Sequence, residues 1–258
     1  MIKAVVFDMG GVIHSLTLDK EKRLSFAADT IKLLESRGLH IPDSPEVFDA
    51  KLKEAGAARK RRNEQTLHEE PALISWTHHY LKEYGATEEQ IFPIVEKLSY
   101  SWLKNRFVDT PREGLHECLE GLYSQGMRLG IISNTVSRTF APDSLCRYGV
   151  SHYFEYILLS SVCGLRKPGA EIFTLCRDSM GLTNEECAYV GDTISRDVIG
   201  VHNAGWQLMI RILEPGASLE VQERERKLAH LDYHPDYTVN ELHEIPAIIA
   251  AYNQSLLA

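Results

Sequence analysis

The sequence predicts an α/β fold in which a doubly wound parallel sheet carries an inserted α-helical domain. Near both ends of the chain, short apolar runs rich in β-branched residues alternate with helical patterns, as they do in parallel sheets. Between them, a segment from about residue 19 to about residue 105 is rich in Ala, Leu, Glu, Lys and Arg and has helical periodicity. We therefore expect a core formed by residues 1–16 and 108–258, with a helical insertion at residues 17–107.

The first predicted strand ends in a carboxylate. Its apolar run Val5-Val6-Phe7 is too short and too β-branched for a helix, and Gly10-Gly11 follows it. Asp8 therefore stands at the carboxyl end of a buried strand, where open α/β sheets bind their ligands. Taken alone, an Asp in this place is more typical of an ordinary turn, so the interpretation depends on three later segments.

The second segment, Leu129–Thr135, predicts another strand, which ends in small polar residues ahead of a helix-like stretch. The Ser133 hydroxyl and the backbone N–H of Asn134 could hold an anion at this point, because a helix dipole adds to their attraction. Either residue alone is more typical of a helix cap.

The third segment, Gly164–Ala170, leads into a helix. Pro168 suits a first helical position, and apolar residues recur at helical spacing from Ile172 to Met180. Lys167 is therefore expected directly before a helix N-terminus, beside a site for negative ligands. Most lysines are solvated surface charges, which is the alternative here.

The fourth segment, Ala188–Asp197, is a strand followed by a turn with two carboxylates, those of Asp192 and Asp197. Two carboxylates on one turn repel each other unless a cation or a helix cap uses them. With Asp8 they form an all-oxygen cluster, and such clusters suit magnesium better than zinc. A helix, a strand at Trp206–Ile210, a charged segment at Glu223–Lys227, a short strand at Asp236–Val239 and a final helix at Ile245–Tyr252 are expected to follow.

Together and in this order, the four segments resemble the haloacid dehalogenase-like hydrolase superfamily. The resemblance implies a Rossmann-like core with a helical cap inserted after the first strand, and an enzyme that removes phosphate from small phosphorylated metabolites with Mg²⁺. It implies that Asp8 is the nucleophile and a metal ligand, and that the Gly10 carbonyl, Asp192 and Asp197 complete the metal site. It implies further that Ser133 and the Asn134 N–H bind phosphate and that Lys167 neutralises charge.

Position 10 departs from the family's phosphatases, which usually carry there an Asp that protonates the leaving oxygen and activates water. Gly10 can do neither, and loss of a general acid/base typically lowers the rate by about 10²–10⁴-fold. His14 is the nearest titratable residue, although a plain loop residue is the favoured interpretation.

Two alternatives remain open at this point. One is a catalytically weak protein that binds a phosphorylated metabolite or a partner protein, which Gly10 favours. The other is a phosphonate hydrolase that forms a Schiff base on a lysine of the insertion, namely Lys51, Lys53 or Lys60. Dehalogenation is disfavoured because Asp192 and Asp197, the expected metal ligands, are both present.

The insertion is expected to move about hinges near residues 15–20 and 104–112, since the resemblance makes it a cap. Its dense basic run, Arg59–Arg62, predicts a solvated helix face; if one arginine faces the core, it could grip a distal carboxylate or phosphate. A polar-aromatic patch of His68, Trp76, His78 and His79 could line the pocket, although His78 and His79 could equally be surface residues.

Composition narrows the class of protein. A formal net charge of −8 argues against a general nucleic-acid binder. No apolar run approaches the roughly 20 residues of a membrane span, and no leader sequence precedes the first strand. The cysteines, Cys118, Cys146, Cys163, Cys176 and Cys187, are scattered and predict reduced thiols in the cytoplasm. Either a monomer or a homodimer is compatible with the sequence.

Overall fold

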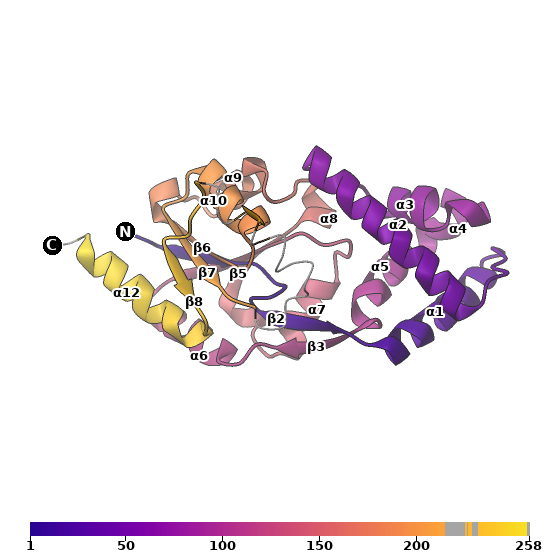
Figure 1. The fold of residues 1–258 in the computed structure, drawn as a ribbon. Coiled ribbons are helices and arrows are strands. Elements are labelled where there is room, and N and C mark those ends of the chain that lie inside the picture. The colour runs from indigo at the N-terminus through magenta and orange to yellow at the C-terminus, as the bar shows by residue number, and fades with distance from the viewer. Residues whose placement is uncertain (215–224, 226, 229–231, 257–258) are drawn as a thin grey trace.

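The computed structural model describes residues 1–214, 225, 227–228 and 232–256 (Figure 1). Among these residues, six parallel strands form one sheet in the order β5-β4-β1-β6-β7-β8. The strands are β1 (Ala4–Phe7), β4 (Arg128–Ser133), β5 (Phe154–Leu159), β6 (Cys187–Gly191), β7 (Leu208–Ile212) and β8 (Tyr237–Val239). The predicted fold class is therefore confirmed.

Strand β1 lies inside the sheet because both of its faces are apolar. Val5 and Phe7 pack into one core cluster, and Ala4 and Val6 pack into a second on the opposite face. Alternate residues of a strand point to opposite faces, so a fully apolar run needs cover on both sides. The covering helices are α6 (Leu115–Ser124), α7 (Phe140–Arg147), α8 (Ser160–Cys163), α9 (Ala170–Ser179), α10 (Ile199–Ala204) and α12 (Ile245–Ser255).

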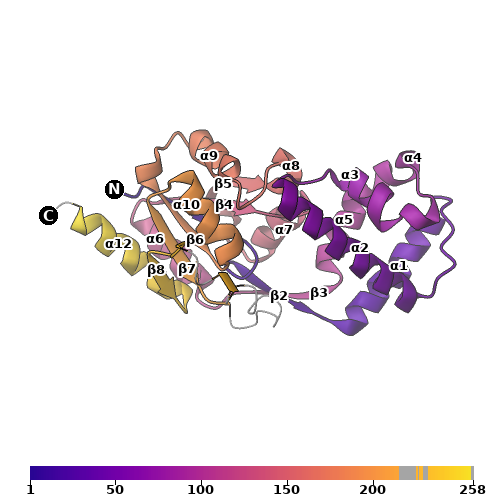
Figure 2. The same cartoon turned by 45° about the horizontal axis from the view of Figure 1, so that its top comes forward.

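The insertion forms a second, all-helical body with its own apolar core, to one side of the sheet (Figure 2). Its helices are α1 (Lys20–Glu35), α2 (Pro45–Thr66), α3 (Ala72–Ser75), α4 (Glu88–Ile91) and α5 (Val95–Lys104). Within the described residues, no helix is long and apolar enough to cross a membrane.

An antiparallel pair of strands, β2 (His14–Leu18) and β3 (Phe107–Pro111), connects the helical body to the sheet. The sequence analysis missed this pair because the two strands mix polar and apolar residues and alternate weakly. The pair spans the segments where hinges were predicted, and the hinges themselves stay a prediction.

Other expected elements differ in detail. Helix α9 begins at Ala170, so the predictions that Pro168 occupies the first helical position and that Lys167 directly precedes the helix were wrong. Strand β7 begins at Leu208, two residues later than expected, and β5 was not predicted. Most of the charged segment at residues 223–227 lies outside the described residues.

A second connection between the helical body and the core is a buried ion-pair cluster around Glu69. Its carboxylate accepts from Arg59 of α2 and from Arg166, which lies in the loop before α9. The Ser160 hydroxyl donates to the same carboxylate at 2.7 Å, and the backbone N–H of Glu69 donates to the Gly164 carbonyl at 2.8 Å. Glu69 therefore joins the two bodies through side-chain and backbone contacts.

We expect Glu69→Gln to lower the free energy of unfolding by about 3 kcal/mol, because two buried guanidinium groups lose their shared anion. Urea denaturation at neutral pH measures the change. The matched control is Glu70→Gln: this neighbouring carboxylate is partly exposed and accepts from Ser75 and His79, so its loss should change stability by less than about 1 kcal/mol. Equal effects of the two substitutions would contradict the stabilising role of the cluster.

Candidate active site

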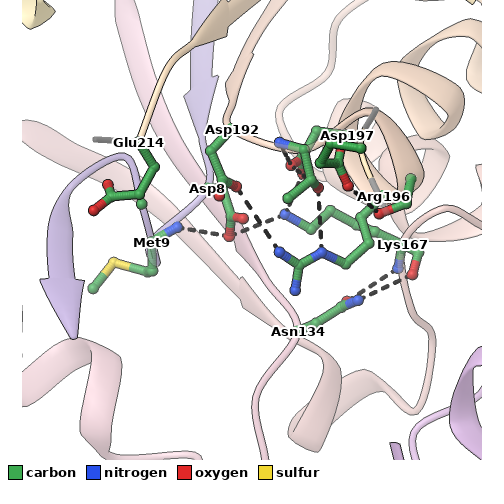
Figure 3. A network of polar contacts seen from close by, with 12 residues as sticks. Asp8, Met9, Asn134, Lys167, Asp192, Arg196, Asp197 and Glu214 are labelled. Atoms are coloured by element: carbon green, nitrogen blue, oxygen red, sulfur yellow. Dashed lines mark hydrogen bonds and ion pairs between the residues drawn. The ribbon is translucent and has the colours of Figure 1, made fainter. Parts of the chain in front are cut away.

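The predicted site residues meet at the carboxyl ends of β1, β4 and β6, as the parallel topology requires. A cavity of about 440 Å³ opens there. It is lined by residues of the first, second and fourth predicted segments, including Asp8, Gly10, Ser133, Asn134 and Asp192. Lys167 of the third segment and Asp197 lie behind this lining and are buried. Figure 3 shows the side chains of Asp8, Lys167, Asp192 and Asp197 gathered in one place.

Asp8, Asp192 and Asp197 form one acidic cluster. Each offers a carboxylate oxygen, and these oxygens all lie within 4.8 Å of one another. Burial raises the pKa of Asp192 to about 8, because the attraction of Arg196 does not outweigh desolvation and the charges of Asp197 and Asp8. Burial also raises the pKa of Asp8, with Lys167 opposing the shift. When all three groups are ionised, their negative charges outnumber the positive charges of Lys167 and Arg196.

Two glycines allow the acidic groups to approach the backbone. Gly11 has a φ of +78°, and a Cβ built on it would lie 2.6 Å from Oδ2 of Asp192. A Cβ on Gly191 would lie 2.4 Å from the Cβ of Asp197. Any larger residue at either position would displace a carboxylate of the cluster, so the glycines belong to the site.

Lys167 supplies positive charge to the cluster. Its Nζ lies 3.0 Å from Oδ1 of Asp8 and 2.7 Å from Oδ1 of Asp197, and donates to the Tyr189 hydroxyl at 2.7 Å. Burial opposes ionisation of Asp197, but Lys167 and then Arg196 outweigh it and hold the pKa of Asp197 below its usual value. The Lys167 ammonium therefore pairs with both Asp8, the candidate nucleophile, and Asp197.

The side chain of Asn134 fixes the backbone that carries this lysine. Its Oδ1 accepts from the Lys167 N–H at 3.0 Å, and its Nδ2 donates to the Lys167 carbonyl at 3.0 Å (Figure 3). This side-chain contact was not predicted from the sequence. It connects the ends of the second and third segments, which are 33 residues apart.

Sequence reasoning also missed three other residues at the site. Arg196 lines the cavity, and its Nη2 lies 3.9 Å from Oδ1 of Asp192. Glu214 lines it as well and accepts from the Ser15 hydroxyl at 2.8 Å. Tyr189 contacts both Lys167 and Asp197. The four-residue spacing of Asp192 and Arg196 was the one available signal, since side chains at that spacing share a helix face.

His14 does not reach the cavity. It is 2% exposed, its Nδ1 lies 2.8 Å from Oδ1 of Asp109, and its ring packs against Phe140. It lies in β2 and not in a loop, and its contacts are those of a structural residue.

The predicted polar-aromatic patch is dispersed. Trp76 is buried in the core of the helical body and donates to Ser99 at 2.9 Å, while His79 contacts Glu70. His78 is mostly exposed. Of the four patch residues, which are all described, none lines the Asp8 cavity, so the suggestion that they line the pocket was wrong.

The parallel sheet, the acidic cluster at its carboxyl edge and the helical insertion after β1 together are the arrangement of one class of hydrolases. Residues 2–205 match the profile of the haloacid dehalogenase-like hydrolases, and the chain belongs to this family. The resemblance inferred from the four segments is thereby confirmed.

A protein named glyceraldehyde 3-phosphate phosphatase from Methanopyrus kandleri is 26% identical over 210 residues, which are 80% of this chain and 82% of that protein. The chain spans about half the length of two other archaeal proteins of the same name that it matches. Two solved structures are similar in fold. They are a HAD phosphatase from Thermococcus onnurineus (TM-score 0.61, 19% identity, 96% of this chain and 98% of that chain) and a 2-haloacid dehalogenase from Pseudomonas syringae pv. Tomato (TM-score 0.63, 19% identity, 98% and 100%).

Proposed function

We propose that the protein is a magnesium-dependent phosphatase of small phosphorylated metabolites, with Asp8 as nucleophile. The observation that carries this proposal is the buried Asp8 carboxylate, which Lys167 contacts at 3.0 Å within an acidic cluster at the base of an open cavity. The proposed site of action, the cytoplasm, rests only on the cysteine pattern of the sequence.

The residues present fit a magnesium ion. Asp8, Asp192 and Asp197 offer oxygen ligands, and the Gly10 carbonyl would be a further one. Oδ1 of Asp192 is buried and has no hydrogen-bond partner among the described residues, as expected of an atom that a cation would satisfy. Bound there, the ion would neutralise the phosphoryl group and the carboxylates around it.

The chain's own groups would then perform two displacements. An Asp8 oxygen attacks phosphorus, and the bond to the ester oxygen breaks, which gives an aspartyl-phosphate and a leaving alkoxide that takes a proton. A water molecule next attacks the phosphoryl group and releases inorganic phosphate and the Asp8 carboxylate. Lys167, which lies beside Asp8, and Ser133, which lines the cavity, would stabilise the charge on the phosphoryl oxygens.

The proton for the leaving oxygen must come from a source other than residue 10. Gly10 has no side chain, and His14 is held by Asp109 away from the cavity. Water in the cavity, an acidic group on the substrate or Glu214, which lines the cavity, would then be the source. The proposed enzyme should therefore work best on substrates whose leaving group needs little protonation.

Phosphonate hydrolysis through Lys51 finds less support. Lys51 pairs with Asp43 and Glu83, and its hydrogen bond to Asp43 raises its pKa, which makes the amine a poorer nucleophile. Borohydride reduction in the presence of a phosphonoaldehyde tests this alternative, since a covalent adduct on Lys51, Lys53 or Lys60 would favour it.

The direct test is phosphate release from a panel of phosphorylated metabolites, with Mg²⁺ and with excess EDTA. We expect release from at least one compound with Mg²⁺ and a loss of at least about 10²-fold in EDTA, because the carboxylates would repel the phosphate. Release that persists unchanged in EDTA would contradict the metal dependence.

Metal binding can also be measured without turnover. We expect Mg²⁺ at about 100 times its dissociation constant to raise the free energy of unfolding by about 2.7 kcal/mol. Asp192→Asn should abolish most of this stabilisation, because it removes a charged ligand. The control is Asp178→Asn, a change of the same kind at an exposed residue. If Mg²⁺ stabilises Asp192→Asn as much as the unmodified protein, Asp192 is not a ligand.

A further inference from the structure

A second cavity, of about 480 Å³, lies beside the Asp8 cavity between the helical body and the core. Leu18, Asn134 and Arg196 line both cavities, so the two adjoin at these residues. The lining of the second cavity is strongly basic, and among the described residues it includes no carboxylate. Its cationic side chains are those of Lys53, Arg59, Lys60, Arg106, Arg166 and Arg196.

Two carboxylates behind this lining are each shared between two arginines. Glu69 is shared by Arg59 and Arg166, so one anion serves two buried guanidinium groups. Asp49 is likewise shared by Arg23 and Arg106. In a chain with a formal net charge of −8, six cationic side chains around one cavity need an explanation.

Arg106 gives an independent indication. It is 4% exposed and lines the cavity, and its guanidinium lies 3.6 Å from the Asp49 carboxylate, which Arg23 shares. Burial lowers its pKa, and Asp49 only partly opposes the shift. An anion in this cavity would therefore add the charge-assisted contact that a shared carboxylate supplies only in part.

One face of helix α2 lines the second cavity. Residues of this face recur at three- and four-residue spacing and are Lys53, Gly56, Ala57 and Lys60. A Cβ on Gly56 would lie 3.1 Å from the Trp102 ring, so the glycine lets the helix pack against that ring. The Arg106 guanidinium lies 3.7 Å from the centre of the same ring, which orients it.

We propose that the second cavity binds an anionic group, a carboxylate or a second phosphate, on the leaving group of the substrate. This inference rests on the proposed phosphatase function and narrows its substrate class to metabolites with two anionic ends. The phosphate to be removed lies at Asp8, and the distal anion lies among Lys53, Lys60 and the arginines. The basic run at Arg59–Arg62 is thus divided: Arg59 is buried against Glu69, Lys60 lines the cavity and Arg61 is exposed.

A matched pair of substrates tests the inference. Glyceraldehyde 3-phosphate and the corresponding acid, 3-phosphoglycerate, share the phosphate and the carbon chain and differ in an aldehyde against a carboxylate. We expect kcat/KM to be at least about tenfold higher for the acid, because a charge-assisted contact is gained. A second pair, fructose 1,6-bisphosphate and fructose 6-phosphate, shows whether a distal phosphate is also preferred to a neutral hydroxyl group.

Matched variants of α2 locate the effect. The double substitution Lys53→Gln/Lys60→Gln should lower the acid-to-aldehyde ratio of kcat/KM at least about tenfold. The control Lys51→Gln/Arg61→Gln removes the same charge from the same helix at residues that do not line the cavity, and should preserve the ratio. Their comparison separates binding in the cavity from a general change in charge.

Equal kcat/KM within each pair, or the same ratio in both double variants, would overturn the inference and leave the phosphatase proposal standing. If no compound releases phosphate, the proposed function fails. Titration calorimetry then tests whether the second cavity binds an anionic group. In the Asp8→Asn protein, 3-phosphoglycerate should bind at least about tenfold more tightly with Lys53 and Lys60 present than with both replaced. Equal affinities there would overturn the inference.

Discussion

Replacement of Asp8 by asparagine is expected to abolish phosphate release, with a loss in kcat of at least about 10⁴-fold. The amide keeps the shape of the side chain and can still contact Lys167, but it cannot form the phosphoryl bond of the first displacement. Steady-state assays with the best substrate of the panel measure the effect. After reaction with a radiolabelled substrate and an acid quench, the unmodified enzyme should retain labelled phosphate on Asp8, and the Asp8→Asn protein should not.

Asp29→Asn is the control for the Asp8 substitution. Asp29 lies exposed on α1, and the same chemical change there should leave the rate within about twofold. Phosphate release that survives Asp8→Asn would mean that another group attacks phosphorus, and the assignment of the nucleophile would fail. The acidic cluster would then have to serve only the metal ion.

Introduction of an aspartate at position 10 is expected to raise kcat for alkyl phosphates by about 10²-fold or more, since a general acid/base typically contributes about 10²–10⁴-fold. The structure offers room for the new side chain. A Cβ at Gly10 meets no atom within 4 Å, and its φ lies outside the left-handed region that disfavours L residues. Because the new carboxyl would act in both displacements, the gain should appear in kcat and exceed any change in KM.

Gly10→Asn is the matched control, because the amide has almost the same size as the carboxyl group and cannot exchange a proton. An activated ester such as p-nitrophenyl phosphate should gain less than an alkyl phosphate, since its leaving oxygen needs little protonation. If Gly10→Asp and Gly10→Asn give the same rate as the unmodified protein, the enzyme already obtains its proton elsewhere. The second anionic group of the substrate is then the first group to examine.

The central strands could be predicted because they are buried on both faces. In β1, β4 and β6 the apolar run stops where the sheet ends, so the next polar residue marks the carboxyl edge. Parallel topology then brings Asp8, Ser133 and Asp192 to one place. The roles of these residues in catalysis stay proposals, whereas their convergence is a property of the fold.

The contacts that complete the site could not be predicted, because they join residues that sequence patterns treat separately. The Asn134 side chain meets the Lys167 backbone across two loops, and neither loop has a periodicity that could reveal the contact. The patch around Trp76 failed for a related reason. Neighbours in sequence were taken as neighbours in space, although a helix turns consecutive side chains to different sides.

The position of Glu69 has a consequence for how the two bodies of the protein can move. Glu69 holds Arg166, and Arg166 is bonded through one peptide unit to Lys167, whose ammonium contacts Asp8. A swing of the helical body must therefore either break the Glu69 contacts or pull on the chain that carries the lysine. Movement of the helical body would therefore be coupled to the position of Lys167 beside Asp8, and a substitution in the insertion would shift this lysine without touching the substrate.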